Sequence, residues 1–297
     1  EIDLDNLPEN DKKTYELLAK GETIGVFQLS GGGMTKWLKE LRPSDFNDIM
    51  AMIALFRPGP MANIPNYINR KHGREKVTYL DPRLEKILGK TYGVVTYQED
   101  VLLIAIEMAG YNWETVDKFR KAIGKKIPAE MAKQEKTFLE GCQKHGGLPP
   151  EKAEALWKLF DPFKGYGFNK AHAASYAQVA YQTAYMKAHY PAEFMTAVMT
   201  ADSGDTEKIA ESITECKRMG IEVLPPDVNE SFGAFTVVND RAIRFGLFSI
   251  KNLGEEIAGA VIEERKTSGP FKSFSDFLDR VHHKNLNKKS LESLIKA

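Results

Sequence analysis

The segment KGYGFNKAHAASYA, from Lys164 to Ala177, combines residue types that are able to hold a phosphate. Asn169 is a common helix-capping residue and an alanine-rich run follows it, so the sequence predicts a long helix that begins here. The first backbone N–H groups of a helix carry partial positive charge, and Lys170 and His172 add to it. Such a helix start binds anions, and a lysine there is unfavourable unless a negative group lies opposite.

The residues just before this helix fit the same chemistry. Gly165 and Gly167 have no Cβ and let the backbone approach a ligand closely. Tyr166, between them, has a ring that can stack on a base. The alternative is an ordinary glycine-containing loop with one solvated lysine, and spacing alone does not decide between the two.

A second basic segment runs from Lys118 to Lys126. Lys118, Lys121 and Lys125 are spaced by three and four, so they share one helix face, where like charges repel by about 0.2–0.5 kcal/mol per pair. Arg120 adds to the same field. A polyphosphate held between this helix and the helix start described above would relieve both strains. The alternative is an exposed helix whose charges are solvated.

Three other patterns resemble known sites only superficially. Gly31-Gly32-Gly33 lacks the GxxxxGK[ST] frame of a phosphate-binding loop. The pair Asp3 and Asp5 has the residue type of a metal site, but such a pair is more often polar surface. The two cysteines, Cys142 and Cys216, have no metal-like spacing, and we expect both to be packing residues in a reducing, cytoplasmic setting.

The elements that must position these residues are predicted to be mostly helices up to about Gly220. The expected caps and helices are: Asp11 to about Gly21, Ser44 to the Arg57–Pro60 turn, 101–108 closed by Gly110, Asn112 through Lys121, a helix opened by Pro128, 153–160, Asn169 to about His189, Pro191 through Thr200, and Thr206 to Gly220. After Gly220 we expect an extended stretch and then a β-hairpin that turns at Asn239-Asp240. Short helices follow at 255–266, 275–281 and 288–296.

The fold class is therefore mainly α, with a domain boundary near 220. Residues 1–220 are expected to form a multi-helical domain, and residues 221–297 a small α+β segment. The chain has 41 basic and 41 acidic residues, which argues weakly against a protein coated all over in nucleic acid. No apolar run approaches the roughly 18 residues of a membrane span. The chain begins at Glu1 rather than Met, so we expect it to be part of a longer protein.

Motifs along nearly the whole chain carry a family resemblance. They are VFQL at 26–29, ALFRPGP at 54–60, RKHGRE at 70–75, TYGVVTYQED at 91–100, FRKAIGKK at 119–126, GYGFNKAHAASYA at 165–177 and KAHYPAEFMTAVMTAD at 187–202. In this order the chain resembles the α subunit of bacterial DNA polymerase III, the C-family replicative polymerase. The resemblance implies that 1–220 is the fingers domain, with a short palm-side lead-in at 1–20.

The resemblance also implies roles for individual residues. In the family a basic pair reaches the triphosphate of the incoming nucleotide (dNTP), which corresponds to Arg120 and Lys121. Many members have two arginines there, and Lys121 keeps the charge but loses the planar fork. Tyr166 corresponds to a tyrosine near the nascent base pair. Lys170 and His172 would lie by the phosphates.

The family's three metal-binding aspartates belong to the palm domain. The pair Asp3 and Asp5 aligns after the palm motifs, so we expect no catalytic residue and no metal ligand in this chain. The Mg²⁺ of the parent enzyme would be held by the palm, and this chain alone is expected to be inactive.

The tail from 221 to 297 resembles the tandem helix-hairpin-helix module that grips duplex DNA in the family. Its first turn reads Asn252-Leu253-Gly254, preceded by Lys251, and we expect Lys251, Asn252 and Gly254 to contact DNA phosphates. The expected partners are primer-template DNA, dNTP, other regions of the α subunit and replicase subunits, with no membrane. The alternatives are a non-catalytic DNA-binding module that keeps this fold, or a helical scaffold with solvated basic faces.

Overall fold

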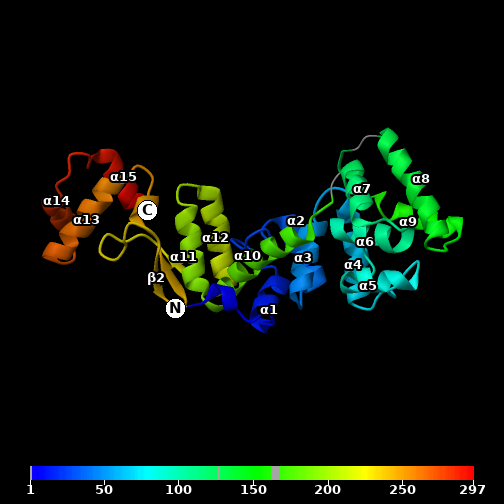
Figure 1. Ribbon diagram of the computed structural model, residues 1–297. Coiled ribbons are helices and arrows are strands. Elements are labelled where there is room, and N and C mark those ends of the chain that lie inside the picture. Colours follow the sequence, from blue (N-terminus) through cyan, green and yellow to red (C-terminus); the bar gives the residue numbers. More distant parts are fainter. Residues whose placement is uncertain (1, 126–127, 162–166) are drawn as a thin grey trace. The chain divides into compact units, whose positions relative to one another are not determined.

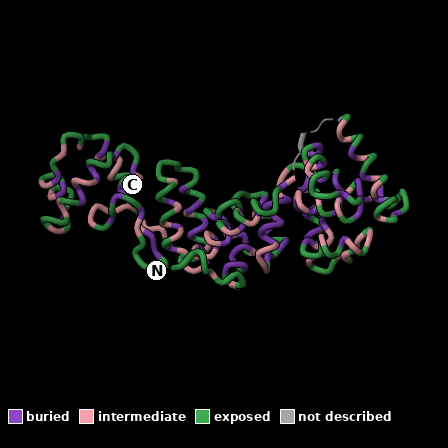
Figure 2. The backbone as a smooth tube through the Cα atoms, in the orientation of Figure 1, coloured by how far each residue is buried: buried purple, intermediate pink, exposed green. Residues whose placement is uncertain are grey.

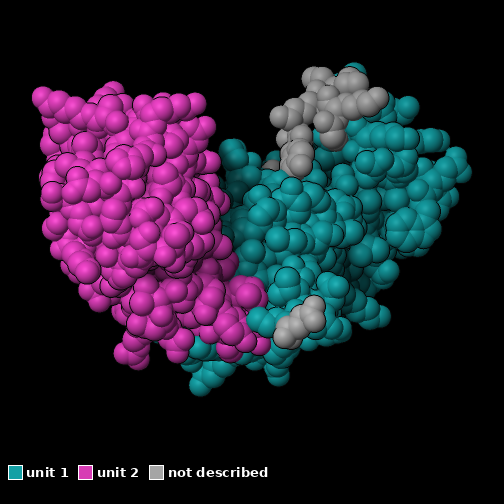
Figure 3. Space-filling model, turned by 90° about the vertical axis from the view of Figure 1, so that its left-hand side faces the viewer, with its two compact units in different colours: residues 1–184 teal, residues 185–297 magenta. Residues whose placement is uncertain are grey.

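The computed structural model describes residues 2–125, 128–161 and 167–297, and it is mainly helical, as predicted (Figure 1). The chain divides into two compact units, Glu1–Ala184 and Tyr185–Ala297, which Figure 3 colours separately. The division falls within one long helix, α10 (Lys170–His189). The domain boundary near residue 220, which is drawn from the sequence, stays a prediction.

The first unit is built from helices joined by short turns. They are α1 (Lys12–Lys20), α2 (Gly32–Leu41), α3 (Phe46–Leu55), α4 (Ile64–Lys71), α5 (Glu85–Leu88), α6 (Gln98–Ala109), α7 (Trp113–Lys125), α8 (Pro128–Lys144), α9 (Pro150–Lys158) and most of α10. Short 3₁₀ turns lie at Leu4–Asn6, Pro60–Asn63, Pro82–Leu84 and Gly89–Thr91. Buried positions recur along these helices, and Figure 2 shows them in purple.

An aromatic cluster forms the core of the helices from α6 to α9. Phe119, Phe138, Trp157 and Phe160 contact one another with ring centroids 5.3–6.2 Å apart, within the range of favourable aromatic pairs. Helix α8 approaches α6 so closely that a Cβ on Gly141 would lie 2.2 Å from the carbonyl oxygen of Ala109. The cluster therefore packs α7, which carries Lys118, Arg120 and Lys121, firmly against α8 and α9.

Most of the helix starts follow the predicted capping residues. The Asp11 carboxylate accepts from the Thr14 N–H at 2.8 Å, and the Asn112 side chain accepts from the Thr115 N–H at 2.8 Å. The α1 helix ends at Gly21, which has φ +71°. These caps confirm the predictions because the signal is local: a short polar side chain next to a free N–H.

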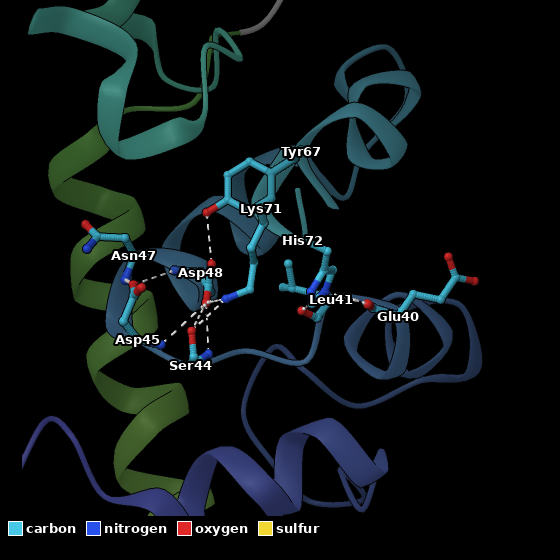
Figure 4. A network of polar contacts seen from close by, with 9 residues as sticks. All are labelled: Glu40, Leu41, Ser44, Asp45, Asn47, Asp48, Tyr67, Lys71 and His72. Carbon is cyan, nitrogen blue, oxygen red and sulfur yellow. Dashed lines mark hydrogen bonds and ion pairs between the residues drawn. The ribbon is translucent and has the colours of Figure 1, made fainter. Parts of the chain in front are cut away.

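A buried polar network joins α3 to α4 (Figure 4). The Asp48 carboxylate accepts from Lys71 Nζ at 2.5 Å, from Tyr67 Oη at 3.1 Å and from the Ser44 N–H at 2.9 Å. The cap of α3 is Asp45, whose side chain accepts from the Asn47 N–H at 2.7 Å. The prediction that Ser44 caps this helix is wrong by one residue, because the Ser44 hydroxyl accepts from Lys71 Nζ at 2.7 Å instead.

The second unit combines helices with a small sheet. Its elements are α11 (Pro191–Ala201), α12 (Thr206–Arg218), β1 (Glu222–Leu224), β2 (Thr236–Asn239), β3 (Ala242–Arg244), a 3₁₀ turn at Leu247–Ser249, α13 (Glu255–Ser268), α14 (Phe274–Arg280) and α15 (Lys288–Lys296). The predicted hairpin is present, since β2 pairs antiparallel with β3. Strand β1 pairs parallel with β3 and makes the sheet order β1-β3-β2.

One cap in the second unit also differs from the prediction. The α12 helix is capped by Asp205, whose side chain accepts from the Lys208 N–H at 3.2 Å, and not by Thr206. At both wrong caps two capping residues stand side by side, and the sequence does not show which one turns toward the helix. The acidic neighbour is the cap in each case.

The two cysteines are buried, as predicted, and each lies in a different unit. Cys142 on α8 and Cys216 on α12 have no exposed surface. Burial raises the pKa of both thiols to about 11. The neighbouring Glu215 pairs with Lys187 Nζ at 2.6 Å, and both of these side chains are almost wholly buried.

Candidate functional site

The start of α10 has the cap that the sequence predicts. Asn169 Oδ1 accepts from the His172 N–H at 2.9 Å, and its backbone carbonyl accepts from the Ala173 N–H. Lys170 and His172 are exposed in the first turn. One face of the helix carries small buried side chains, which allow neighbouring elements to approach its backbone closely. They are Ala173, Ala177, Ala180 and Ala184.

A carboxylate from the first turn of α6 already lies at this helix start. Glu99 Oε2 accepts from the Lys170 N–H at 2.8 Å, and Glu99 Oε1 accepts from Asn169 Nδ2 at 2.5 Å. The sequence predicts a negative group opposite Lys170, and in this structure the chain itself supplies it. Sequence reasoning missed Glu99, because its partners lie about 70 positions further along the chain.

The Lys170 ammonium group also lies over an aromatic ring and near a buried acid. Its Nζ is 5.3 Å from the centre of the buried Tyr97 ring, a cation–π contact. Asp100, 2% exposed, accepts from the backbone N–H groups of Thr96 and Tyr97, each at 2.9 Å. Burial raises the pKa of Asp100 to about 6, although those two bonds and the charge of Lys170 act in the opposite direction.

The basic pair on α7 is held by an acid on the same helix. Asp117 accepts from Arg120 Nη2 at 2.8 Å and lies 2.7 Å from Lys121 Nζ. Hydrogen bonds from Lys121 and then Arg120 lower the pKa of Asp117. Both basic side chains are substantially exposed, at 40% and 59%. The two cations are therefore accessible to solvent, and the Asp117 carboxylate neutralises part of their charge.

The structure brings Arg120 of α7 next to Gly167, which precedes α10. Arg120 and Gly167 line the same small cavity, of about 10 Å³, together with Gln98. A Cβ on Gly167 would lie 3.0 Å from the Gln98 Cβ, so this close approach favours glycine. The Gln98 N–H donates to the carbonyl of Phe168 at 2.9 Å. The two predicted phosphate-handling segments are thus neighbours, although Tyr166 lies outside the described residues.

Arg57 is a further cation here that sequence reasoning did not single out. Its guanidinium carbon lies 3.9 Å from the centre of the Phe168 ring, and its Nη2 donates to the Ile53 carbonyl at 3.0 Å. The available signal was its place in the turn that ends α3, directly before Pro58. The contact with Phe168 joins α3 to the segment before α10.

The turn at 251–254, predicted as the first turn of the helix-hairpin-helix module, has an unusual backbone. Asn252 has φ +65°, the left-handed region in which asparagine is tolerated. Lys251, Asn252 and Gly254 are exposed, whereas Leu253 between them is buried. Gly254 caps α13 without a side chain, and a Cβ there would meet nothing within 4 Å. The turn therefore presents its backbone to solvent.

An open groove of about 660 Å³ lies beside this turn. It is lined by Lys251 and Asn252 from the turn and by Ser293 and Lys296 from α15. The Asn252 side chain donates to Ser293 Oγ at 3.2 Å. In the loop before α15, Asn287 caps α15 and Asn285 donates to Glu256 on α13. These contacts and the Asn252–Ser293 bond tie α15 to α13 and to the turn before it.

Comparison with known proteins connects these features to one family. Residues 1–146 match the finger domain of the bacterial DNA polymerase III alpha subunit, and residues 220–297 match a helix-hairpin-helix motif. The whole chain is 49% identical to the DNA polymerase III subunit alpha of Thermus aquaticus, over 302 residues. The chain belongs to the DNA polymerase III α-subunit family. The family resemblance expected from the motifs is confirmed.

Other DNA polymerase III α subunits match equally broadly. The identity is 46% over 303 residues for Pseudomonas aeruginosa, with 100% of this chain covered, and 46% over 301 residues for Escherichia coli K12, with 99% covered. The chain spans about a quarter of the length of these relatives, from 25% for Thermus aquaticus to 26% for the other two.

The candidate residues are distributed over these DNA polymerase III matches. Arg120 and Lys121 fall within the finger-domain match, and the turn at 251–254 falls within the helix-hairpin-helix match. Lys170 and His172 lie between the two, in a part that the full-length relatives cover.

In the described ranges 2–125, 128–161 and 167–297, no helix is long and apolar enough to cross a bilayer.

Proposed function

We propose that this chain holds the triphosphate of an incoming dNTP within a DNA-dependent DNA polymerase and also contacts primer-template DNA. The observation that supports the proposal is that Arg120 of α7 and Gly167, three residues before Lys170, line the same small cavity. Two basic segments that are distant in the sequence thus lie next to each other at this cavity. A triphosphate, with several negative charges, is a ligand that such a pair of segments can hold.

The charges of Arg120 and Lys121 would stabilise the phosphates. Both now pair with Asp117, at the surface, where ion pairs are worth only about 0–1 kcal/mol. A triphosphate can therefore take over these partners at small cost. Arg120 offers a planar fork to two phosphate oxygens, whereas Lys121 offers a single ammonium group.

The start of α10 would supply backbone N–H groups and two side chains. Lys170 and His172 are exposed in its first turn, and a phosphate there would compete with Glu99 for the Lys170 N–H. Tyr166, which precedes this turn, is proposed to lie at the nascent base pair, by analogy with the family. The N-terminal charge of the helix favours the phosphate over water.

The residues present do not fit a site for the Mg²⁺ of such a polymerase. The Asp3 carboxylate accepts from the Asp5 N–H at 3.0 Å and from Asn6 Nδ2 at 2.6 Å, so it serves as a local cap. Within the described part of the chain, no three His, Cys, Asp or Glu side chains are grouped to hold a metal. We infer that palm aspartates supply the metal ligands and that this chain contributes no catalytic residue.

Lys251, Asn252 and Gly254 are proposed to contact the DNA backbone. The left-handed Asn252 and the exposed Gly254, which has no side chain, would let a phosphate approach the backbone of the turn closely. Contacts of this kind fix position on the duplex and are independent of base sequence.

The nucleotide assignment is tested by Lys170→Ala and Arg120→Ala in a DNA polymerase III α subunit that contains this segment. Removal of a charge-assisted contact, worth about 1.5–3 kcal/mol, should lower kcat/KM for dNTP incorporation by about tenfold to hundredfold. Lys12→Ala is the control, because Lys12 is 90% exposed and pairs only loosely with Glu16 at 3.9 Å. Unchanged kcat/KM in both test variants would refute the assignment.

The chain alone should not extend a primer in the presence of Mg²⁺. The assay is primer extension with the purified 297-residue chain, with an intact α subunit as the positive control. Robust extension by the chain would show that it contains a complete metal site, contrary to the proposal.

A further inference from the structure

A ladder of aromatic rings runs along one side of α10 and ends on an arginine. The Phe27 ring lies 5.3 Å from Tyr176, Tyr176 lies 4.1 Å from His172, and His172 lies 5.3 Å from Phe168. Arg57 then covers Phe168 at 3.9 Å. We call these five residues the α10 ladder. It has no role in the proposed contacts to the triphosphate except through His172.

The ladder opens to solvent, unlike the aromatic core of the first unit. His172 is exposed, Phe27 is 36% exposed and Tyr176 is half-buried, whereas Phe168 at the arginine end is 7% exposed. Core rings such as Phe119 and Phe138 have no exposed surface. Rings that a fold needs only for packing are normally covered, so this exposed run indicates a surface for a flat ligand.

The ladder is fixed in place before any ligand binds. His172 and Tyr176 are four residues apart on α10, so they share one face of the helix. Phe168 precedes the helix, and its ring contacts His172 at 5.3 Å. Phe27 comes from the loop before α2, and its N–H donates to Thr183 Oγ1 on α10 at 3.1 Å. A preset arrangement of rings lowers the entropy that is lost when a ligand stacks on it.

The glycine run at 31–33 packs against the residue that precedes Arg57. A Cβ on Gly33 would lie 3.0 Å from the Phe56 ring, and Phe56 directly precedes Arg57. A Cβ on Gly31 or on Gly32 would meet nothing within 4 Å. Gly31 caps α2 without a side-chain hydrogen bond, so the backbone here is bare and accessible. The backbone at Gly31 and Gly32 therefore leaves room for the close approach of a sugar-phosphate chain.

We propose that the α10 ladder binds the unpaired template strand by stacking of its bases. This inference rests on the proposed function, because an unpaired strand near the dNTP site is what a template-directed polymerase presents. The chemistry is that of single-strand binding: aromatic faces for successive bases, with the cations Arg57 and Lys170 nearby for phosphates. Duplex DNA does not fit, since its bases already stack on one another.

The test measures the binding of a fluorescein-labelled single-stranded oligothymidine to the 297-residue chain by anisotropy. Phe27→Leu and Tyr176→Leu each remove one ring and should weaken binding by about fivefold or more, the effect expected from one lost base-aromatic stack. Phe27→Trp keeps an aromatic face and should retain the affinity, which also shows that the loop tolerates substitution. Trp113→Leu, at a ring that is 72% exposed on α7, is the matched control and should change nothing.

Three results would overturn the inference: no single-strand binding by the wild type, unchanged binding in both leucine variants, or an equal loss of duplex binding. If the ladder binds a protein instead, the wild type will not bind oligothymidine, which is the first of these results. Failure of the proposed function is distinguishable. In that case Lys170→Ala and Arg120→Ala leave nucleotide use unchanged, whatever Phe27→Leu does to single-strand binding.

Discussion

At the scale of single residues, Asp100 is a charge that the fold keeps in an unfavourable place. Both backbone N–H groups that it accepts, from Thr96 and Tyr97, donate to the same oxygen, Oδ2. Burial nevertheless dominates and raises its pKa to about 6. The folded state therefore binds a proton to Asp100 more tightly than the unfolded state does, and stability falls as pH rises through this range.

Asp100→Asn should remove this pH dependence. In the wild type the contribution of Asp100 to the free energy of unfolding is lost between about pH 4, near the unfolded pKa, and about pH 6. Asparagine can place its Oδ1 where Oδ2 accepts both bonds, without a charge to bury. We therefore expect equal or higher stability at neutral pH, by up to about 3 kcal/mol, and a flatter profile.

The measurement for Asp100 is urea unfolding of both proteins at a series of pH values. Asp240→Asn, at an exposed hairpin residue, controls for the loss of one carboxylate. A variant that is several kcal/mol less stable than the wild type at neutral pH would mean that the charge itself is needed.

At the scale of elements, the Asp48 network holds α3 against α4. The Lys71 side chain is 7% exposed and the Asp48 side chain 1%, so the pair is buried (Figure 4). A buried pair brings little net stability compared with a well-packed apolar pair, but removal of one partner leaves an uncompensated charge. The network therefore makes the two helices depend on each other.

Lys71→Met should destabilise the chain by about 3–5 kcal/mol, because Asp48 would stay buried without its cation. The double variant Lys71→Met with Asp48→Asn should lose less than the sum of the two single changes. Chemical unfolding of all three variants gives the coupling energy, with Lys12→Met as an exposed control. A loss within about 1 kcal/mol for Lys71→Met would contradict a buried charge pair.

Local signals account for what the sequence predicts correctly at this scale. Asp11, Asn112 and Asn169 cap their helices because each supplies an acceptor three residues before a free N–H. Ser44 and Thr206 are wrong by one residue, since their acidic neighbours compete for the same place. Such competition is settled by packing, which a single sequence does not display.

Long-range contacts account for what the sequence does not predict. Strand β1 joins the sheet through parallel pairing with β3, and no turn signal marks that pairing. Glu99 meets the start of α10 only after the chain folds. The motif at 165–177 and Arg120 became candidates from residue type and from family resemblance. Their proximity, seen in the cavity shared by Arg120 and Gly167, had to come from the structure.

At the scale of the whole molecule, positive and negative charges balance. With 41 basic and 41 acidic residues, the chain has no long-range attraction to DNA from net charge. Affinity for duplex DNA must then come from local groups such as the turn at 251–254. This makes the effect of a single lysine measurable.

Lys251→Ala should weaken duplex binding and reduce the magnitude of the slope of log affinity against log salt by about 1. The reason is that the variant makes one phosphate contact fewer and so releases fewer counterions from the DNA. Lys266→Ala is a matched control from the same unit, since Lys266 pairs with Glu263 at 3.0 Å on α13. The measurement is a salt titration of duplex affinity. An unchanged slope in Lys251→Ala would remove this residue from the DNA contact.

The two buried cysteines give the chain built-in reporters. Cys142 lies in one compact unit and Cys216 in the other, and both thiols are inaccessible and hard to ionise in the folded state. Because a thiol-specific label reacts with the exposed thiolate, modification requires the surrounding unit to open. Labelling followed by peptide mass analysis therefore times the opening of each unit separately, without any engineered probe.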